Sequence, residues 1–454
     1  MFAALAAGGG DRSAVRHLAA AQRSKRLLLI RAVLDQAEAA GEEVHGPVFR
    51  GYQGLARLHG VSPAGAAAVE GILAYPSVGA WAASALRTLV RSGRLPPEPG
   101  FLESVAAAAA VRAGIPQTLT VPVVDGRVQL PSLGSAELSL GPAELGSAGL
   151  DRSRSALIRS GPRRTVITTA RARVILPACA VNRGGTDWAP LPSLHSLAQG
   201  LRLAMVLDDT DRWIFPDRER VGKLGPADLG TWRRTFDSAW SLLVRRHSVA
   251  AREIAAALSV VVPLPTPTDG NLSATSLEAF GAIAISQPRG RHQLAATLVH
   301  EVQHAKLGAL LDVVPLLEGP DPARWYAPWR DDPRPLSGLL QGAYAHLGVA
   351  GFWRQVRWSE PQTGTGAGAA SSTHRQSCAH TEFARCCVGT ADAIATLRSS
   401  DALTPAGRRF VTVMAETVQA WQREPLPQVA AVLARKAIRE HRKTWLARYG
   451  RIAL

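Results

Sequence analysis

The sequence predicts an α+β fold that is mostly helical, and three observations support this expectation. Apolar residues recur at helical spacing through much of residues 11–114. Short runs rich in Val, Ile and Thr follow between residues 121 and 262 and predict strands. Helical spacing returns from residue 293 onward. We therefore expect an N-terminal helical region (1–115), a central mixed α/β region (116–265) and a third region that ends in several helices (266–454).

In the first region we expect helices joined by short loops. Apolar residues from Leu18 to Leu34 are typical of one helix over residues 16–40. Another helix is expected from Trp81 onward, with Ser77 as its N-terminal cap. Gly and Pro residues between 93 and 100 predict a loop after it.

The second region alternates strand and turn signals. Asp125-Gly126 lies between two apolar runs and predicts a hairpin. The expected elements are a hairpin at 121–130, strands at 165–169, 173–176, 201–207 and 258–262, and a long helix at 226–246. Asp208, Asp209 and Asp211 form an acidic turn, for which a solvated bend is the expectation and a site for a hard cation the alternative.

Composition limits the classes of protein to which the chain can belong. Its 454 residues are enough for two or three domains, and a hydrophobic share of 46% indicates a globular protein. The formal net charge of +16 comes mostly from Arg and is spread along the chain. This charge favours an acidic partner, such as an acidic peptide or an anionic co-substrate. No basic stretch alternates with aromatic residues, so we expect no nucleic-acid partner.

The cysteines and the apolar runs indicate the cellular compartment that we expect for the protein. The four cysteines form no CxxC pair, and the adjacent Cys386 and Cys387 would make a poor disulfide. The first residues lack a basic stretch and a long apolar run, so we expect no signal peptide. No run of about eighteen uncharged apolar residues offers a membrane span. We therefore expect a soluble protein of the reducing cytoplasm, whose oligomeric state nothing in the sequence indicates.

The run His300-Glu301-Val302-Gln303-His304 is the most informative motif of the chain. Residues 293–312 contain no Pro and carry apolar side chains typical of a buried helix. Two histidines four residues apart share one helix face, so both imidazoles can hold one metal ion, with Glu301 beside them to handle a proton. The alternative is a polar surface pair. A strand expected at 279–286 would lie beside this helix in a zincin-like arrangement and could present an extended peptide.

A metal site needs at least one further ligand. A zinc peptidase would use a third protein ligand, an open position for water and Glu301 as base. Glu318 is near in sequence, but Pro and Gly surround it, and the pattern HExxHxxGxxH fails at Gly308 and Leu310. His346 is the better candidate because it lies in an apolar helix expected at 337–353, and the alternative is a core histidine with a satisfied hydrogen bond.

Two other histidines follow the motif. His374 falls in a Gly- and Ser-rich stretch, expected to form a loop at 364–373. His380 is expected to open the first of two or three terminal helices.

Several segments together resemble the actinobacterial HExxH peptide β-hydroxylases. They are the HExxH motif, Tyr326-Ala-Pro-Trp-Arg330, Asp332-Pro-Arg-Pro335 and the helix that contains His346. HExxH alone is shared with many peptidases, but its combination with Pro-Trp-Arg and Asp-Pro-Arg-Pro is far more selective. The likeness extends over the whole chain, including the opening residues 2–11 and the segment 76–81. Enzymes of this family depend on 2-oxoglutarate and tailor ribosomally made peptides.

The resemblance implies a mononuclear Fe(II) site in the region 266–454, with 2-oxoglutarate and O2 as co-substrates and a precursor peptide as substrate. His300, His304 and a further histidine, for which we choose His346, would bind the iron. Arg330 or Arg334 would bind the far carboxylate of 2-oxoglutarate, with Arg330 preferred.

Alternatives to these roles stay open. Arg330 and Arg334 could instead form surface ion pairs with Asp331 or Asp332. Glu301 could orient a ligand or the substrate rather than act as a base. Two further functions also stay open: a zinc metallopeptidase of the HExxH type, which would cleave a peptide without 2-oxoglutarate, and a peptide-binding scaffold whose site has decayed.

Overall fold

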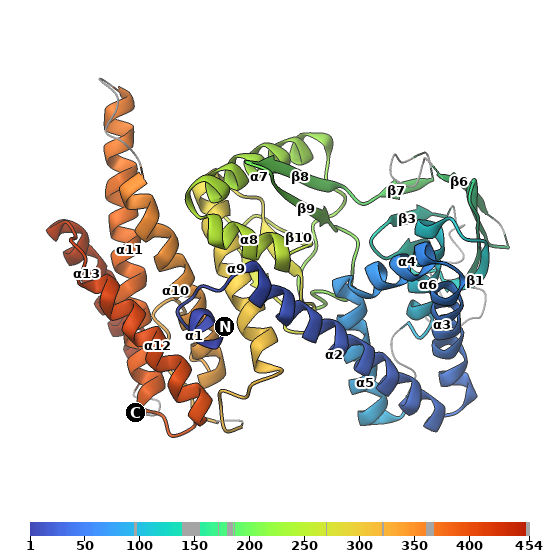
Figure 1. The fold of residues 1–454 in the computed structure, drawn as a ribbon, viewed down its shortest axis with the longest axis horizontal. Coiled ribbons are helices and arrows are strands. Elements are labelled where there is room, and N and C mark those ends of the chain that lie inside the picture. The colour runs from blue at the N-terminus through green and yellow to red at the C-terminus, as the bar shows by residue number, and fades with distance from the viewer. Residues whose placement is uncertain are drawn as a thin grey trace.

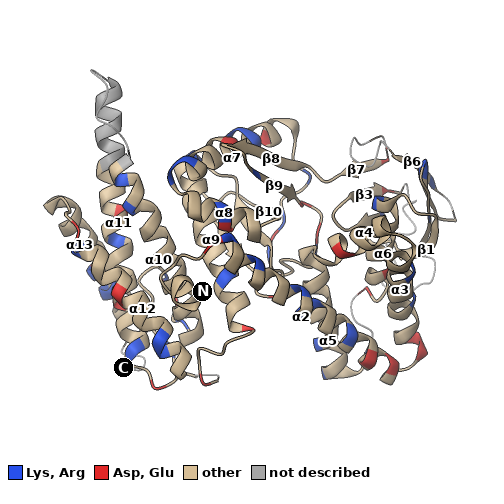
Figure 2. Ribbon diagram, viewed as in Figure 1, with Lys and Arg blue, Asp and Glu red and all other residues tan. Residues whose placement is uncertain are grey.

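The computed structural model describes residues 1–94, 98–138, 155–170, 172–178, 185, 187–268, 270–319, 322–359 and 367–450, except for the side chains of 359 and 367–376. The chain is 58% helical with smaller sheets, so the prediction of a mostly helical α+β fold is confirmed. Figure 1 shows helices α3, α4 and α6 with the small sheets at one end and helices α10 to α13 at the other. Lys and Arg occur in helices of every part of the molecule (Figure 2).

The described residues of the first region form six helices, α1 to α6. They are α1 Phe2–Ala6, α2 Arg12–Ala39, α3 Glu42–Val61, α4 Pro63–Leu73, α5 Pro76–Ser92 and α6 Phe101–Ala113. Asp11 caps α2 by accepting a hydrogen bond from the backbone of Ala14. The predicted cap at Ser77 is wrong, because α5 already begins at Pro76, a residue suited to the first helical position, and Ser77 is fully buried inside the helix.

Twelve strands lie in the described ranges. They are β1 Gln117–Pro122, β2 Arg127–Leu130, β3 Gly134–Glu137, β4 Ser155–Ser160, β5 Arg164–Thr168, β6 Arg173–Pro177, β7 Trp188–Pro190, β8 Ser193–Ala198, β9 Leu201–Leu207, β10 Val260–Leu264, β11 Ser273–Thr275 and β12 Ala282–Ser286. Their orders are β1-β4-β5-β6, β2-β3-β7 and β11-β12-β10-β9-β8. The strands predicted at 165–169, 173–176 and 201–207 are thereby confirmed as β5, β6 and β9.

The hairpin predicted over residues 121–130 is only half correct. Asp125 and Gly126 do form a tight turn with positive φ angles, closed by a bridge between Val124 and Arg127. The strands on either side separate, however, because β1 pairs with β4 and β2 pairs with β3. Pro122 ends β1 and has no N–H for a ladder, which accounts for the separation at this point.

The five-stranded sheet separates two hydrophobic cores and leads into the metal-motif helix. Strands β9, β10 and β12 run parallel, and the short edge strand β11 is antiparallel to β12. Along β10, Val261 faces the core shared with the C-terminal helices, whereas Val260 and Val262 face the core of the N-terminal helices. Helices α7 Pro226–Arg246 and α8 Ser248–Ala257 connect β9 to β10, and α7 matches the predicted helix.

The acidic turn after β9 is not the solvated bend that we expected. Asp208 and Asp211 are 1% and 3% exposed. Asp208 Oδ1 accepts hydrogen bonds from the backbone of Thr210 and Asp211, and Asp211 Oδ1 accepts from the backbone of Trp213 and Ile214. The two carboxylates therefore organise the loop by satisfying its buried N–H groups.

The remaining helices are α9 Arg291–Leu311, α10 Leu336–Ser359, α11 Ala367–Ser399, α12 Pro405–Gln422 and α13 Gln428–Tyr449. The loop predicted at 364–373 is wrong from Ala367 onward, where α11 begins; residues 364–366 lie outside the described residues. His380 therefore lies within α11 rather than at its start. None of the helices in the described ranges is both long and apolar enough to cross a membrane.

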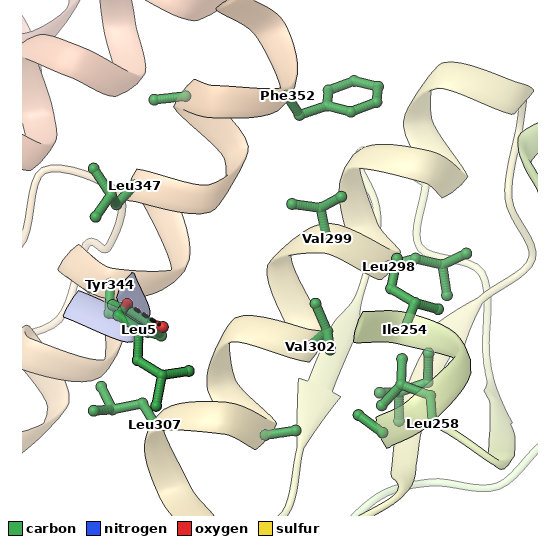
Figure 3. Close-up of a cluster of buried hydrophobic side chains, with 14 of the residues drawn as sticks. Leu5, Ile254, Leu258, Leu298, Val299, Val302, Leu307, Tyr344, Leu347 and Phe352 are labelled. Atoms are coloured by element: carbon green, nitrogen blue, oxygen red, sulfur yellow. Dashed lines mark hydrogen bonds between the residues drawn. The ribbon is translucent and has the colours of Figure 1, made fainter. Parts of the chain in front are cut away.

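The N-terminal segment lies against the C-terminal helices, far from it in sequence (Figure 1). Leu5 is buried, and its carbonyl accepts a hydrogen bond from the Tyr344 hydroxyl of α10 at 2.7 Å (Figure 3). The ring of Phe2 contacts Phe410 of α12. The carbonyl of Gly8 accepts a hydrogen bond from Gln303 Nε2 at 2.6 Å, so the opening residues are tied to the motif helix itself.

Candidate metal centre

Helix α9 carries the HExxH motif beside α10. Its two histidines are one turn apart, and the Nε2 atoms of His300 and His304 lie 3.1 Å from each other. Two imidazole nitrogens about 2.1 Å from one metal ion, at angles of about 90–109°, lie about 3.0–3.4 Å apart. The observed distance also suits a hydrogen bond between the rings. The pair therefore has the spacing of two ligands of one metal ion without any rearrangement.

A hydrogen bond fixes the tautomer of His304. Its Nδ1 lies 3.1 Å from Oε1 of Gln341 on α10, and because this oxygen can only accept, Nδ1 carries the proton. The lone pair is then on Nε2, the atom that faces His300. An outer hydrogen bond of this kind holds ligating histidines in many metal sites.

His346 approaches the pair from α10. Its ring centroid is 5.1 Å from that of His300. Its Nδ1 donates to the Gly342 carbonyl at 2.9 Å, which again leaves the lone pair on Nε2. Trp329 stacks on one face of the ring, with centroids 4.2 Å apart. The indole thus forms an apolar wall against this histidine.

The charge state of the rings suits metal binding. Burial lowers the pKa of His300 well below its ordinary value, and the neighbouring His304 and His346 lower it further. Burial also lowers the pKa of His346 to about 4, with help from the charge of Arg385 and against the hydrogen bond to Gly342. Both rings are therefore neutral near pH 7, the form that binds metal ions.

The three histidines lie close together but do not form a finished site. In the part of the chain that the structure describes, no three or more His, Cys, Asp or Glu side chains are arranged to hold one ion. His300 and His304 have the spacing of two ligands, whereas the ring plane of His346 lies at 86° to that of His300. The role of His346 as third ligand therefore stays a prediction.

Glu301 points to the edge strand β11. Its side chain is 1% exposed, and its Oε2 accepts a hydrogen bond from the Thr275 hydroxyl at 2.5 Å. The carboxylate is therefore held between α9 and β11. This contact ties the motif helix to β11, a strand that was not predicted; the strand expected at 279–286 is β12, and the zincin-like arrangement stays a prediction.

Arg330 and Arg334 both bind Asp332. Arg330 Nε lies 2.7 Å from one carboxylate oxygen and Arg334 Nη1 lies 3.2 Å from the other. The Arg330 side chain is 53% exposed, so its ion pair is strongly screened by water. Both arginines therefore form the ion pairs that the alternative interpretation expected, with Asp332 as the shared partner. Their role toward a co-substrate stays a prediction.

Arg385 is a basic residue near the cluster that sequence reasoning missed. It lies on α11, its Nη2 donates to Glu382 at 2.7 Å, and its charge helps to lower the pKa of His346. Its single local signal is the i,i+3 pair with Glu382, a spacing common on solvated helix faces. Only the packing of α11 against α10 brings it near the histidines.

The other candidate ligands lie elsewhere. Glu318 is exposed in the loop after α9. His380 is buried on α11, and its ring lies 5.8 Å from Trp358. The side chain of His374 lies outside the described residues.

Comparison of the chain with protein-family models and with curated protein sequences finds no match.

Proposed function

We propose that the protein is an Fe(II)- and 2-oxoglutarate-dependent oxygenase that hydroxylates a β-carbon in a ribosomally made precursor peptide. The observation that carries the proposal is the 3.1 Å separation between the Nε2 atoms of His300 and His304, with His346 beside them. Iron, with 2-oxoglutarate and O2, supplies the oxidising chemistry, while the protein binds, orients and shields. Three imidazoles suit Fe(II) and leave open positions for a co-substrate.

The residues around the histidines have distinct tasks in this proposal. Gln341 and the Gly342 carbonyl hold the Nδ1 protons of His304 and His346, which aims both Nε2 lone pairs inward. Trp329 covers one face of His346 and keeps water from that side. These contacts orient two of the ligands before any metal arrives.

The co-substrate requires a cation for its far carboxylate. Arg330 and Arg334 are the candidates from the sequence, and each would have to leave Asp332. Arg385 is a third candidate, supported by its electrostatic effect on His346. All three candidates are arginines, and a guanidinium group can bind a carboxylate through two parallel N–H···O hydrogen bonds.

Strand β11 is where an extended peptide would bind. It lies at the edge of its sheet, where among the described strands it pairs with β12 alone, and it contacts the motif helix through Thr275 and Glu301. An unpaired strand edge can accept a peptide as an additional strand. This arrangement supports a peptide rather than a small free substrate.

The alternative function, a zinc metallopeptidase, needs the Glu301 carboxylate available to accept a proton from a metal-bound water. Here the Glu301 carboxylate is buried and accepts a hydrogen bond from Thr275. Glu318, the nearest carboxylate in sequence, is exposed in its loop. Both observations favour the oxygenase.

The test is an anaerobic titration that needs no knowledge of the peptide. Purified protein is loaded with Fe(II), 2-oxoglutarate is added, and the weak visible charge-transfer band of a chelated keto acid is recorded. We expect a saturable band that disappears in His304→Ala and persists in His195→Ala, a matched change at an exposed histidine on β8. No band, with zinc retained and a peptide cleaved, would establish the peptidase instead.

The same titration assigns the cation. Arg330→Gln, Arg334→Gln and Arg385→Gln are compared, and the residue that binds the far carboxylate is the one whose loss raises the 2-oxoglutarate concentration at half saturation by tenfold or more, about 1.4 kcal/mol. Iron affinity, measured without 2-oxoglutarate, should stay unchanged in that variant.

A further inference from the structure

The four-stranded sheet β1-β4-β5-β6 has one face in the protein core and the other face open to solvent. Successive side chains of a strand point to opposite faces, and Ile158, Ile167 and Val174 belong to the core of the N-terminal helices. The alternate side chains form a second face, which we call the outer face, and all of them are exposed or half-buried. They are Thr118, Thr120, Pro122, Ser155, Leu157, Arg159, Arg164, Val166, Thr168, Arg173, Ile175 and Pro177.

The outer face carries positive charge without any compensating acid. Arg159, Arg164 and Arg173 lie on it, and Arg163 lies in the turn just before β5. All four side chains are exposed, and none of them makes an ion pair or a side-chain hydrogen bond with another described residue. The four strands themselves contain no Asp or Glu. A surface of this kind attracts an acidic partner.

An apolar pair lies between two of these arginines. Val166 of β5 and Ile175 of β6 are directly opposite each other, and Ile175 is 47% exposed. Arg173 is two residues from Ile175 along β6, and Arg164 is two residues from Val166 along β5, on the opposite side of the pair. Two residues of a strand span about 7 Å. The outer face therefore presents a cation, an apolar patch and a second cation at even spacing beside β6.

Strand β6 also has unused backbone groups. It lies at the edge of its sheet, where β5 is its one partner among the described strands. Ala172 and Ala178, at its two ends, form backbone hydrogen bonds with the residues that flank β5. By the alternation of an antiparallel ladder, the N–H and C=O groups of Arg173 and Ile175 point to the free edge, together with the carbonyl of Pro177. An extended peptide can add there as a fifth strand.

Two other interpretations of the outer face account for less of it. Arginine and proline on an edge strand also discourage pairing with another copy of the chain. That role does not explain Arg159, which lies on β4, two strands away from this edge. A single-stranded nucleic acid would need aromatic side chains on which its bases stack, and the four strands contain none. The apolar pair and the free edge instead favour an extended peptide.

We propose that β6 and the outer face bind an extended acidic peptide segment with the pattern acid-x-aliphatic-x-acid. The segment adds antiparallel to β6, its aliphatic side chain lies against Val166 and Ile175, and its two carboxylates face Arg164 and Arg173. The sheet lies at the opposite end of the molecule from α10 to α13 (Figure 1), so this contact holds the peptide far from the histidines. Assigning the segment to the peptide substrate rests on the proposed oxygenase function, whereas the surface itself does not.

The experiment is fluorescence anisotropy on the full-length, metal-free protein at low salt. The probe is the fluorescein-labelled peptide Thr-Glu-Thr-Leu-Thr-Glu-Thr, for which we expect saturable binding at or below about 1 mM. Three control peptides have Gln in place of both Glu, the two Glu side by side, or N-methyl-leucine, which cannot donate to the Ile175 carbonyl. Each should bind about tenfold more weakly, because each loses either ion pairs or a backbone hydrogen bond.

Charge reversal locates the site. The double variant Arg164→Glu, Arg173→Glu should weaken the probe at least tenfold, and a peptide with Lys in place of both Glu should bind to this variant instead. The double variant Arg233→Glu, Arg245→Glu changes two exposed arginines of α7 and alters the net charge by the same amount. It should keep the affinity of the unchanged protein within about twofold.

Four results would overturn the proposal. They are no saturable binding of the probe at millimolar concentration, equal affinity for all four Glu- and Gln-containing peptides, failure of the Lys peptide to bind to the charge-reversed variant, and tighter binding of a twelve-residue oligouridylate that displaces the probe. The last result would indicate a nucleic-acid surface. The assay contains neither iron nor 2-oxoglutarate, so failure of this docking surface is distinguishable from failure of the proposed oxygenase activity.

Discussion

The indole of Trp329 lies flat against the imidazole of His346, with centroids 4.2 Å apart and 16° between the ring planes. Trp329 belongs to the Pro-Trp-Arg segment and His346 to α10, so the stacking brings two segments of the sequence pattern into direct contact. The contact is close only because residue 342, one turn before His346, is Gly.

Gly342→Ala should therefore weaken metal binding. A Cβ at this position would lie 2.5 Å from Nε1 of Trp329 and closer than 3 Å to its ring carbons, so the indole must move away from His346. We expect the affinity for Co(II), followed by its visible absorption, to fall at least tenfold, as for other residues that orient metal ligands.

Gly71→Ala is the matched control. It introduces the same Cβ in helix α4, where the nearest atom is 3.7 Å away at Arg112. Alanine is the better helix former, so this control should be slightly more stable, by about 0.5–1 kcal/mol, with unchanged Co(II) affinity. Equal Co(II) affinity in Gly342→Ala would show that the stacking does not support the site.

Gln341→Leu tests the tether of His304. The change removes the oxygen that accepts from Nδ1 and leaves the ring free to rotate or to adopt the other tautomer. We expect the Co(II) affinity to fall about 10–100-fold with little change in unfolding temperature. Gln36→Leu, at an exposed position on α2, provides the control for the added apolar surface. A large loss of stability with normal affinity would make Gln341 a structural residue only.

The histidine pair could be predicted from the sequence because both residues lie on one helix, so that spacing alone fixes their relative position. His346 could be singled out because a buried histidine without a polar partner is costly in an apolar helix. Arg385 could not, because only the packing of α11 on α10 brings it near the cluster. Gln341 was not distinguished either: nothing local shows that its amide faces His304.

In the fold, too, elements with a local sequence signal could be predicted and non-local contacts could not. The helix at 226–246 and the strands β5, β6 and β9 follow from local periodicity and match the structure. The pairing of β1 with β4 is non-local, joining residues about forty apart, and turn chemistry at Asp125-Gly126 suggested a nearer partner. The contact of Gly8 with Gln303 joins residues 295 positions apart, and neither local sequence pattern indicates it.

His247 should make the fold sensitive to acid. Burial lowers its pKa from 6.5 to about 4, and the charges of His292 and Arg246 add to the effect. The unfolded chain takes up this proton below about pH 6.5 and the folded protein only near pH 4, so stability is full above pH 6.5 and falls as the pH drops. The loss should approach about 3 kcal/mol at pH 4.

Comparison with His247→Gln isolates this contribution. Urea unfolding is measured for both proteins from pH 7.5 to pH 4, and the difference between the two free energies of unfolding is plotted, which cancels the titration of other groups. That difference should shrink by about 1.4 kcal/mol for each pH unit below pH 6.5. A difference that does not change with pH would mean that His247 takes up its proton as readily in the folded protein as in the unfolded chain.

Removing one partner of the ion pair between Lys306 and Glu253 should destabilise the fold more than the intact pair stabilises it. Nζ and Oε2 lie 2.8 Å apart, and the side chains are 1% and 3% exposed. Burial lowers the pKa of Lys306 and raises the pKa of Glu253, so desolvation opposes both charges while their attraction favours them. Lys306→Met leaves a buried carboxylate without its cation and should cost about 3–5 kcal/mol in urea unfolding.

The double variant Lys306→Met, Glu253→Gln distinguishes this pair from ordinary packing. Once neither side chain carries a charge, the desolvation penalty of an unpaired ion disappears, and the double variant should be more stable than Lys306→Met alone. Lys306 also donates to the Gly9 carbonyl at 3.0 Å, a bond that methionine cannot replace, so recovery should be incomplete. If the double variant loses as much stability as Lys306→Met and Glu253→Gln lose separately when summed, the two charges are not coupled.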